Sequence, residues 1–99
     1  MNFDVSFLPK AEIEYIKAYK WYEEQLEGLG ERFSMAVEKQ LNKIVKNPYH
    51  YPLKKRNCQE CKIQLFPYII VYKVYSDANN IVIISVFHTS RNPKMKYRK

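Results

Sequence analysis

Residues 66–93 read FPYIIVYKVYSDANNIVIISVFHTSRNP, and this stretch decides the fold. Two runs of β-branched and aromatic residues, Tyr68–Tyr75 and Ile81–His88, flank a short polar segment at 76–80. This pattern is typical of a β-hairpin. We expect the hairpin to form the centre of a small antiparallel sheet and to carry functional residues, His88 and Arg91 among them, at its outgoing end.

The segment before the hairpin predicts one strand and two helices. Residues 3–8 alternate apolar and polar side chains, which indicates a short strand, and Pro9 suits the first turn of a helix. A helix is expected over Pro9–Glu27, with an apolar stripe at three- and four-residue steps: Ala11, Tyr15, Ala18, Tyr22, Leu26 and Leu29, widened by Ile13, Ile16 and Trp21. Gly28 and Gly30 separate it from a second helix over Glu31–Lys46, which Asn47-Pro48 ends.

The remaining segment completes the predicted fold. Residues 48–60 are expected to be loop, and a strand is expected over 62–65, because Ile63 and Leu65 alternate with polar residues. Pro67 should mark the junction into the next strand, since proline donates no ladder hydrogen bond. We therefore predict a single α+β domain over residues 1–99, in the order β-α-α-β-β-β, with the helical hairpin packed on one face of an antiparallel sheet.

The two hairpin strands are apolar on both faces, and a helical hairpin can cover only one of them. The C-terminal tail, a second copy of the chain or another protein could close the other face. We hypothesise that a protein partner covers part of it, because a large uncovered apolar surface is unusual on a monomer.

Charge is unevenly distributed along the chain. Residues 1–38 contain four basic and eight acidic side chains, whereas residues 39–99 contain thirteen basic and two acidic ones. A C-terminal part with a net charge of +11 attracts polyanions, so nucleic acid, an acidic protein or an anionic membrane are possible partners; a solvated basic surface is the alternative.

Several side chains are candidates for a functional site. His88 could act as a general acid or base, although a structural histidine that bonds the following turn is favoured. Arg91 could hold a phosphate or carboxylate, or could pair with an acidic residue of the first helix. A basic tail and several tyrosines could contact nucleic acid or simply be solvated and packed: Lys94, Lys96, Arg98 and Lys99, and Tyr49, Tyr51, Tyr68, Tyr72 and Tyr97.

The two cysteines, Cys58 and Cys61, form a lone C-x-x-C. A structural zinc would need two further ligands, and a thioredoxin-like pair would lie at a helix start rather than before a strand. We therefore predict no metal and no cofactor. No leader peptide and no apolar run long enough to span a membrane is visible, so a soluble cytoplasmic protein without a membrane partner is expected.

Five motifs in series resemble the RelE/ParE superfamily of toxins from bacterial type II toxin–antitoxin pairs, and the ParE-like branch in particular. They are A-x-x-W-Y-E-E-Q at 18–25, G-L-G-x-R-F at 28–33, N-P at 47–48 with Y-P at 51–52, F-P-Y-x-I-x-Y at 66–72, and V-F-H-x-x-R-N-P at 86–93. The resemblance implies the fold predicted above and a cognate antitoxin whose C-terminal segment wraps the toxin.

The resemblance also implies one of two activities. RelE-like members cut messenger RNA on the ribosome with basic residues and a C-terminal basic or tyrosine residue, whereas ParE-like members poison DNA gyrase. Leu65-Phe66-Pro67 stands where an arginine lies in the RNA-cleaving branch, and the loss of such a cation typically costs about 10²-fold or more. We therefore expect a ParE-like toxin that binds gyrase without covalent chemistry.

Two alternatives stay open. One is a ribosome-dependent endoribonuclease with His88, Arg91 or Tyr97 as catalytic candidates, in which Lys54 and Arg56 would help Arg91 to hold phosphate; the other is a non-toxic member that only binds its partner. The residues expected to contact the target or the antitoxin are Lys54, Lys55, Arg56, Tyr68, Tyr72, His88, Arg91 and Lys94.

Overall fold

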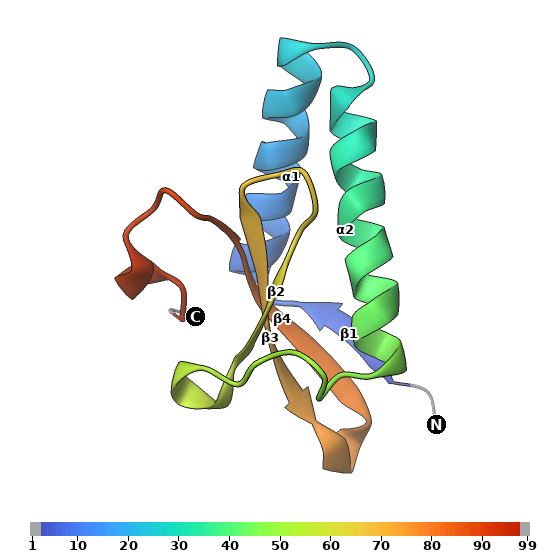
Figure 1. Cartoon of the computed structure of the whole chain (residues 1–99), viewed down its shortest axis with the longest axis vertical. Helices are drawn as coiled ribbons and strands as arrows, with labels where there is room; N and C mark the ends of the chain where they lie inside the picture. Colours follow the sequence, from blue (N-terminus) through green and yellow to red (C-terminus); the bar gives the residue numbers. More distant parts are fainter. Residues whose placement is uncertain (1–2, 98–99) are drawn as a thin grey trace.

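A computed structural model describes residues 3–97 and consists of a four-stranded sheet with two long helices packed on it (Figure 1). The strands and long helices are β1 (Asp4–Phe7), α1 (Pro9–Gln25), α2 (Leu29–Lys46), β2 (Gln59–Lys62), β3 (Tyr68–Tyr75) and β4 (Asn80–His88). Three single turns of 3₁₀-helix lie between or after them: η1 (Lys55–Asn57), η2 (Ser76–Ala78) and η3 (Pro93–Met95). The predicted α+β class and β-α-α-β-β-β order are confirmed.

The sheet has the strand order β1-β4-β3-β2. The pairs β2–β3 and β3–β4 are antiparallel, as the hairpin pattern predicts, but β1 pairs with β4 in parallel, with Val5 opposite Ile81. The sheet is therefore mixed rather than purely antiparallel. The alternation in residues 3–8 predicts a strand, but it carries no information on which strand lies beside it or in which direction.

The strand expected over 62–65 lies three residues earlier, at Gln59–Lys62, so both that prediction and the loop assigned to 48–60 were wrong at this point. Ile63 is buried, but Leu65 has a φ of +70° and is 93% exposed in the turn that leads to β3. The apolar alternation of Ile63 and Leu65 therefore ends in a turn, because the chain must reverse before Tyr68 to pair with itself.

The helical hairpin packs on one face of the sheet and extends beyond it (Figure 1). Ala11 and Ala18 of α1 are buried as the stripe predicts, and Phe33, Val37 and Ile44 of α2 are buried opposite them. The prediction was wrong for four other members of the stripe, whose side chains are largely exposed: Ile13, Ile16, Trp21 and Leu26. At 100° per residue, Ile13 and Ile16 lie on the side of α1 opposite Ala11 and Ala18.

The turn between the helices depends on Glu23 and two glycines. The backbone N–H groups of Gly28 and Gly30 donate to the two carboxylate oxygens of Glu23, each at 2.9 Å, which satisfies donors at the start of α2. Gly28 has a φ of +88°, which favours glycine. At Gly30 a Cβ atom would lie 2.7 Å from the Tyr19 carbonyl, so only glycine fits between the helices.

The other face of the sheet is covered by the chain itself. Ile69, Val71, Ile84 and Phe87 form a second buried cluster with Cys58, and Met95 and Tyr97 of the C-terminal segment pack against it. We call this the outer core, and the cluster under the helices the inner core. The hypothesis that a partner covers an open apolar face was therefore wrong, because the C-terminal segment fills that place.

Candidate functional site

The residues predicted to bind a target fall into three separate hollows. Lys55, Arg56 and Lys94 line the first, Lys54 lines the second, and the third is lined by Tyr68, His88 and Arg91. Tyr72 lines none of these, because it is fully buried and donates its hydroxyl to the Pro48 carbonyl at 2.7 Å. Tyr72 is therefore a core residue, and burial raises the pKa of its phenol.

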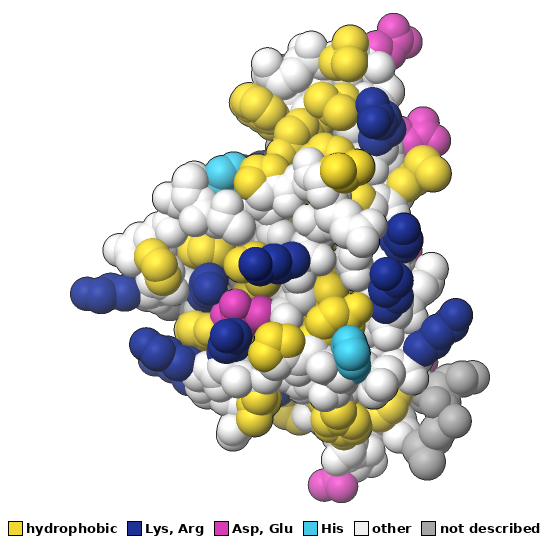
Figure 2. All heavy atoms as spheres, in the orientation of Figure 1, with side chains coloured by type: hydrophobic (Ala, Val, Ile, Leu, Met, Phe, Trp, Pro, Cys, Tyr) yellow, Lys and Arg dark blue, Asp and Glu magenta, His cyan; other side chains and the backbone are white. Residues whose placement is uncertain are grey.

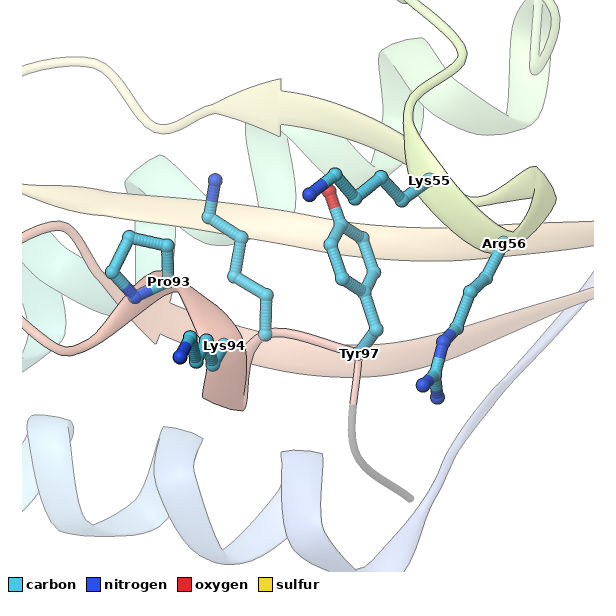
Figure 3. A pocket seen from close by; sticks show the side chains of 6 residues that line it. Lys55, Arg56, Pro93, Lys94 and Tyr97 are labelled. Carbon is cyan, nitrogen blue, oxygen red and sulfur yellow. The ribbon is translucent and has the colours of Figure 1, made fainter.

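The first hollow, of about 390 Å³, is lined by Lys55, Arg56, Pro93, Lys94, Lys96 and Tyr97 (Figure 3), and we call it the basic pocket. Tyr97 stands between η1 and η3, and its hydroxyl donates a hydrogen bond to the Glu60 carboxylate. Burial and the Glu60 carboxylate together raise the pKa of the Tyr97 phenol to about 12. Tyr97 is therefore protonated at neutral pH.

Cations dominate the basic pocket. Lys96 forms an ion pair with Glu60 at 3.3 Å, whereas Lys55, Arg56 and Lys94 form no ion pair with a described carboxylate. Lys and Arg side chains also gather over the middle of this face of the molecule, while hydrophobic side chains are prominent at the top, over the end of the helical hairpin (Figure 2). Like charges brought this close attract an anion. The predicted tail residues Arg98 and Lys99 lie outside the described residues.

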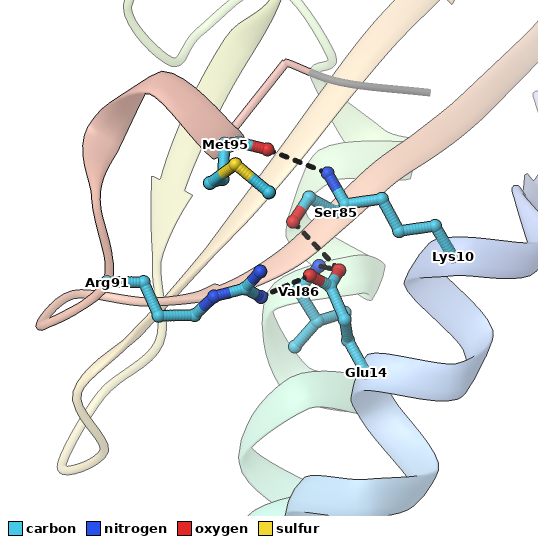
Figure 4. Close-up of polar contacts among 6 residues, drawn as sticks. All are labelled: Lys10, Glu14, Ser85, Val86, Arg91 and Met95. Carbon is cyan, nitrogen blue, oxygen red and sulfur yellow. Dashed lines mark hydrogen bonds and ion pairs between the residues drawn. The ribbon is translucent and has the colours of Figure 1, made fainter.

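Glu14 of α1 is the centre of a polar cluster that we call the Glu14 clamp (Figure 4). One carboxylate oxygen accepts from the Ser85 hydroxyl at 2.8 Å and from the Val86 N–H at 3.1 Å, and the other accepts from Arg91 at 2.7 Å. Nearby, the Lys10 ammonium donates to the Met95 carbonyl at 2.8 Å. Of the two roles considered for Arg91, the structure shows the ion pair with an acidic residue of the first helix.

His88 lies beside the Glu14 clamp, in a hollow of about 290 Å³. Its Nδ1 accepts from the Ser90 N–H at 3.0 Å, and its ring packs edge-on against Tyr68 at 4.9 Å. This is the structural role favoured for His88, a histidine that bonds the following turn. Trp21 also lines this hollow and is 56% exposed, although the apolar pattern of the sequence predicts it in the buried stripe. The spacing could have predicted this position, because Trp21 lies seven residues after Glu14 and therefore on the same side of α1.

The two cysteines do not lie together. Cys58 belongs to the outer core and Cys61 to the inner core, and both are buried. Burial raises the pKa of the Cys61 thiol, which disfavours the reactive thiolate. No group of three metal-binding side chains occurs within residues 3–97.

The comparisons with known proteins identify the family. The model of the ParE toxin of the type II toxin–antitoxin system parDE matches residues 5–93. The chain belongs to this ParE toxin family. It is therefore the toxin component of a type II toxin–antitoxin pair, and the family implies an antitoxin partner.

Solved structures of related toxins share the fold. A chain of the chromosomal ParDE system from P. aeruginosa superposes with a TM-score of 0.75 at 12% identity, over 89% of this toxin and 97% of that chain. A mutant of the E. coli toxin RelE in the free state, with two arginines replaced by alanine, superposes with a TM-score of 0.68 at 22% identity. The match covers 91% of this toxin and 86% of that chain. The isolated E. coli RelE toxin superposes with a TM-score of 0.64 at 20% identity, over 93% of this toxin and 89% of that chain.

No curated protein matches the chain by sequence. Within residues 3–97, neither helix combines the length and the apolar character that a membrane-spanning segment requires.

Proposed function

We propose that the toxin acts in the cytoplasm by binding DNA gyrase and inhibiting it, with no covalent step by its own side chains. The match of the ParE family over residues 5–93 carries this proposal. The basic pocket supplies the contact surface, because Lys55, Arg56 and Lys94 present positive charge without a carboxylate partner among the described residues. The DNA to which gyrase is bound offers phosphate groups to such a pocket.

A supercoiling assay tests the proposal. Purified toxin added to gyrase, ATP and relaxed plasmid should inhibit supercoiling, and the double variant Lys55→Gln/Lys94→Gln should require a higher concentration for the same effect. Lys20→Gln/Lys46→Gln removes the same charge from exposed positions of α1 and α2 and should inhibit as the unaltered toxin does. Undiminished supercoiling at a large excess of folded toxin would contradict the proposal.

The second candidate is a ribosome-dependent endoribonuclease, which one observation favours: Tyr97 lies among four cations in a pocket that a phosphate could enter. Tyr97 could serve there as a general acid but not as a base, because its pKa is about 12. His88 lies apart from it, since His88 packs on Tyr68 at the inner core while Tyr97 packs on the outer core. Arg91 is paired with Glu14.

Translating ribosomes distinguish the two activities. Cleavage of messenger RNA in the ribosomal A site, with a loss of about 10²-fold or more in Tyr97→Phe, would establish the nuclease and end the gyrase proposal. Intact transcripts would contradict the nuclease and leave the gyrase proposal to the supercoiling assay. Unimpaired growth when the toxin is expressed without an antitoxin would instead identify a non-toxic member that only binds its partner.

A further inference from the structure

The hollow beside the Glu14 clamp, of about 290 Å³, lies between α1 and the exit of the β3–β4 hairpin, and we call it the Trp21 hollow. The lining residues that matter here are Lys17, Ala18 and Trp21 of α1, Val86 and His88 of β4, and Arg91. Among the described residues its lining and that of the basic pocket have no member in common. The activity proposed above therefore makes no use of it.

The Trp21 hollow has a small apolar floor and an aromatic wall. Ala18 and Val86 are buried, and the single methyl group of Ala18 leaves room above it. Trp21 follows Ala18 by three residues on α1 and is 56% exposed. Its ring packs nearly perpendicular to that of Tyr22, with the centroids 5.2 Å apart, which restrains the indole. An exposed indole face is a platform on which a planar heteroaromatic ring stacks.

Two cations lie beside this platform. Lys17 is exposed and forms no ion pair with a carboxylate within residues 3–97. Arg91 donates from Nη1 to Glu14 at 2.7 Å, but its side chain is 40% exposed and its other nitrogens can bind a second anion (Figure 4). Because Glu14 is already bonded through both oxygens, Lys17 leaves the hollow with a net positive charge. Phosphate is an anion that lysine and arginine bind well.

The tautomer of His88 follows from its hydrogen bonds. Its Nδ1 accepts from the Ser90 N–H at 3.0 Å, and a backbone N–H can only donate. The neutral imidazole therefore carries its proton on Nε2, which has no hydrogen-bond partner within residues 3–97. The Trp21 hollow thus combines an exposed aromatic face, an unused ring N–H donor and two cations.

We propose that the Trp21 hollow binds a nucleotide. The base stacks on the Trp21 indole above Ala18, and the His88 Nε2–H donates to an acceptor on the edge of the base. The phosphate lies between Lys17 and Arg91. Every nucleobase has a π-face, so the hollow accepts either a free mononucleotide or an unpaired nucleotide of a strand. The proposal does not depend on gyrase as the target, because none of these residues lines the basic pocket.

Trp21 is the only tryptophan of the chain, so its fluorescence reports on the hollow directly. Adenosine monophosphate should quench this fluorescence saturably, beyond the collisional quenching that free N-acetyltryptophanamide shows. By calorimetry, Trp21→Leu and Lys17→Gln should each weaken binding by about fivefold or more, through the lost stacking and the lost phosphate contact. Lys46→Gln removes the same charge from an exposed position of α2 and should bind as the unaltered toxin does. Circular dichroism checks that all three variants fold.

Fragments of the ligand separate its two halves. Adenosine lacks the phosphate and ribose phosphate lacks the base, so each should bind at least about fivefold more weakly than adenosine monophosphate. Equal binding of ribose phosphate would reduce the hollow to an anion site, and equal binding of adenosine would remove the phosphate contact; either result overturns the proposal. Tighter binding of phosphotyrosine amide, which carries a phosphate on a protein side chain, would assign the hollow to a protein segment and also overturn it.

Proton spectra locate the ligand. The Trp21 indole N–H should shift on binding, and the amides of Lys55 and Lys94 should not. A lack of saturable quenching at millimolar nucleotide, or equal losses in Lys17→Gln and Lys46→Gln, would leave only general charge attraction and refute the site.

The length of the ligand identifies its source. This titration uses Lys55→Gln/Lys94→Gln toxin, so that the basic pocket contributes little. A Kd that is the same for adenosine monophosphate and a short oligoadenylate indicates a free nucleotide as the natural ligand. A Kd that falls steeply with length indicates an unpaired strand.

Discussion

The two faces of the sheet have similar side chains but are closed in different ways. Ile70, Ile81, Ile83 and Val86 face the inner core, where α1 and α2 cover them with a continuous apolar layer. Ile69, Val71, Ile84 and Phe87 face the outer core, where an irregular C-terminal segment covers them. Helices satisfy their own backbone hydrogen bonds, whereas an irregular segment needs other partners.

Polar contacts anchor the C-terminal segment at three points. Arg91 binds Glu14, the Met95 carbonyl accepts from Lys10, and Lys96 and Tyr97 bind Glu60. The inner core therefore depends mainly on apolar burial, whereas the C-terminal segment that covers the outer core depends on a few hydrogen bonds and ion pairs. This difference predicts that changes in the two places will have effects of different size and a different dependence on pH.

The largest effect is expected at Phe33, which is fully buried under the helical hairpin. Phe33→Ala should lower the free energy of unfolding by about 3–5 kcal/mol, because it removes a buried ring and leaves a cavity. Urea denaturation measures this. Met35→Ala on the same helix, where the side chain is 64% exposed, should change stability by less than about 0.5 kcal/mol. Similar losses in both variants would mean that the inner core is not the main source of stability.

A smaller effect is expected at Glu14. Glu14→Ala should cost about 1–3 kcal/mol, because the buried Ser85 hydroxyl and the Val86 N–H lose their acceptor. Hydrogen exchange should also become faster in residues 91–95, since Arg91 loses its anchor. Glu24→Ala, at an exposed position of the same helix, is the control. An unchanged rate of hydrogen exchange in residues 91–95 would show that the Glu14 clamp does not hold the C-terminal segment on the outer core.

Tyr97 should have a modest effect that depends on pH. Tyr97→Phe should cost about 1 kcal/mol near neutral pH through the lost bond to Glu60. The folded-state pKa of Tyr97, about 12, exceeds its ordinary value of 10, so the stability it contributes is full below pH 10 and is lost as pH rises toward 12. The thermal unfolding temperature should therefore fall less steeply between these pH values for Tyr97→Phe than for the unaltered toxin. Parallel slopes would contradict the raised pKa.

The smallest effect is expected on the solvent side of α1. Ile13 is 53% exposed and lies opposite the buried stripe, so Ile13→Gln should change the free energy of unfolding by less than about 0.5 kcal/mol. Ala18→Gln, on the buried side of the same helix, should be clearly destabilising by comparison. A loss above about 1 kcal/mol for Ile13→Gln would mean that the apolar stripe is wider than the structure shows.

The candidate site was predictable in its parts but not in its grouping. The sequence indicated Lys55, Arg56 and Lys94 as contact residues, and the structure brings them into one pocket although about forty residues separate the first two from the third. It also indicated Tyr72, which the fold places in the core. A tyrosine in a strand reads the same whether it faces solvent or not, because its ring is apolar and its hydroxyl can bond either water or a carbonyl.

The sequence by itself determined the α+β class, the order of elements, the helical hairpin and the central β3–β4 hairpin, because periodicity, prolines and glycines act over a few residues. It also determined the family, through motifs at 18–25 and 28–33 and at the exit of the last strand. Only the tertiary structure decided that β1 runs parallel to β4, that the C-terminal segment closes the outer face, and that Arg91 is bound to Glu14. Each of these features brings together residues that are far apart in the chain, or depends on which segment closes the outer face of the sheet. Local sequence patterns extend over only a few residues and therefore do not predict them.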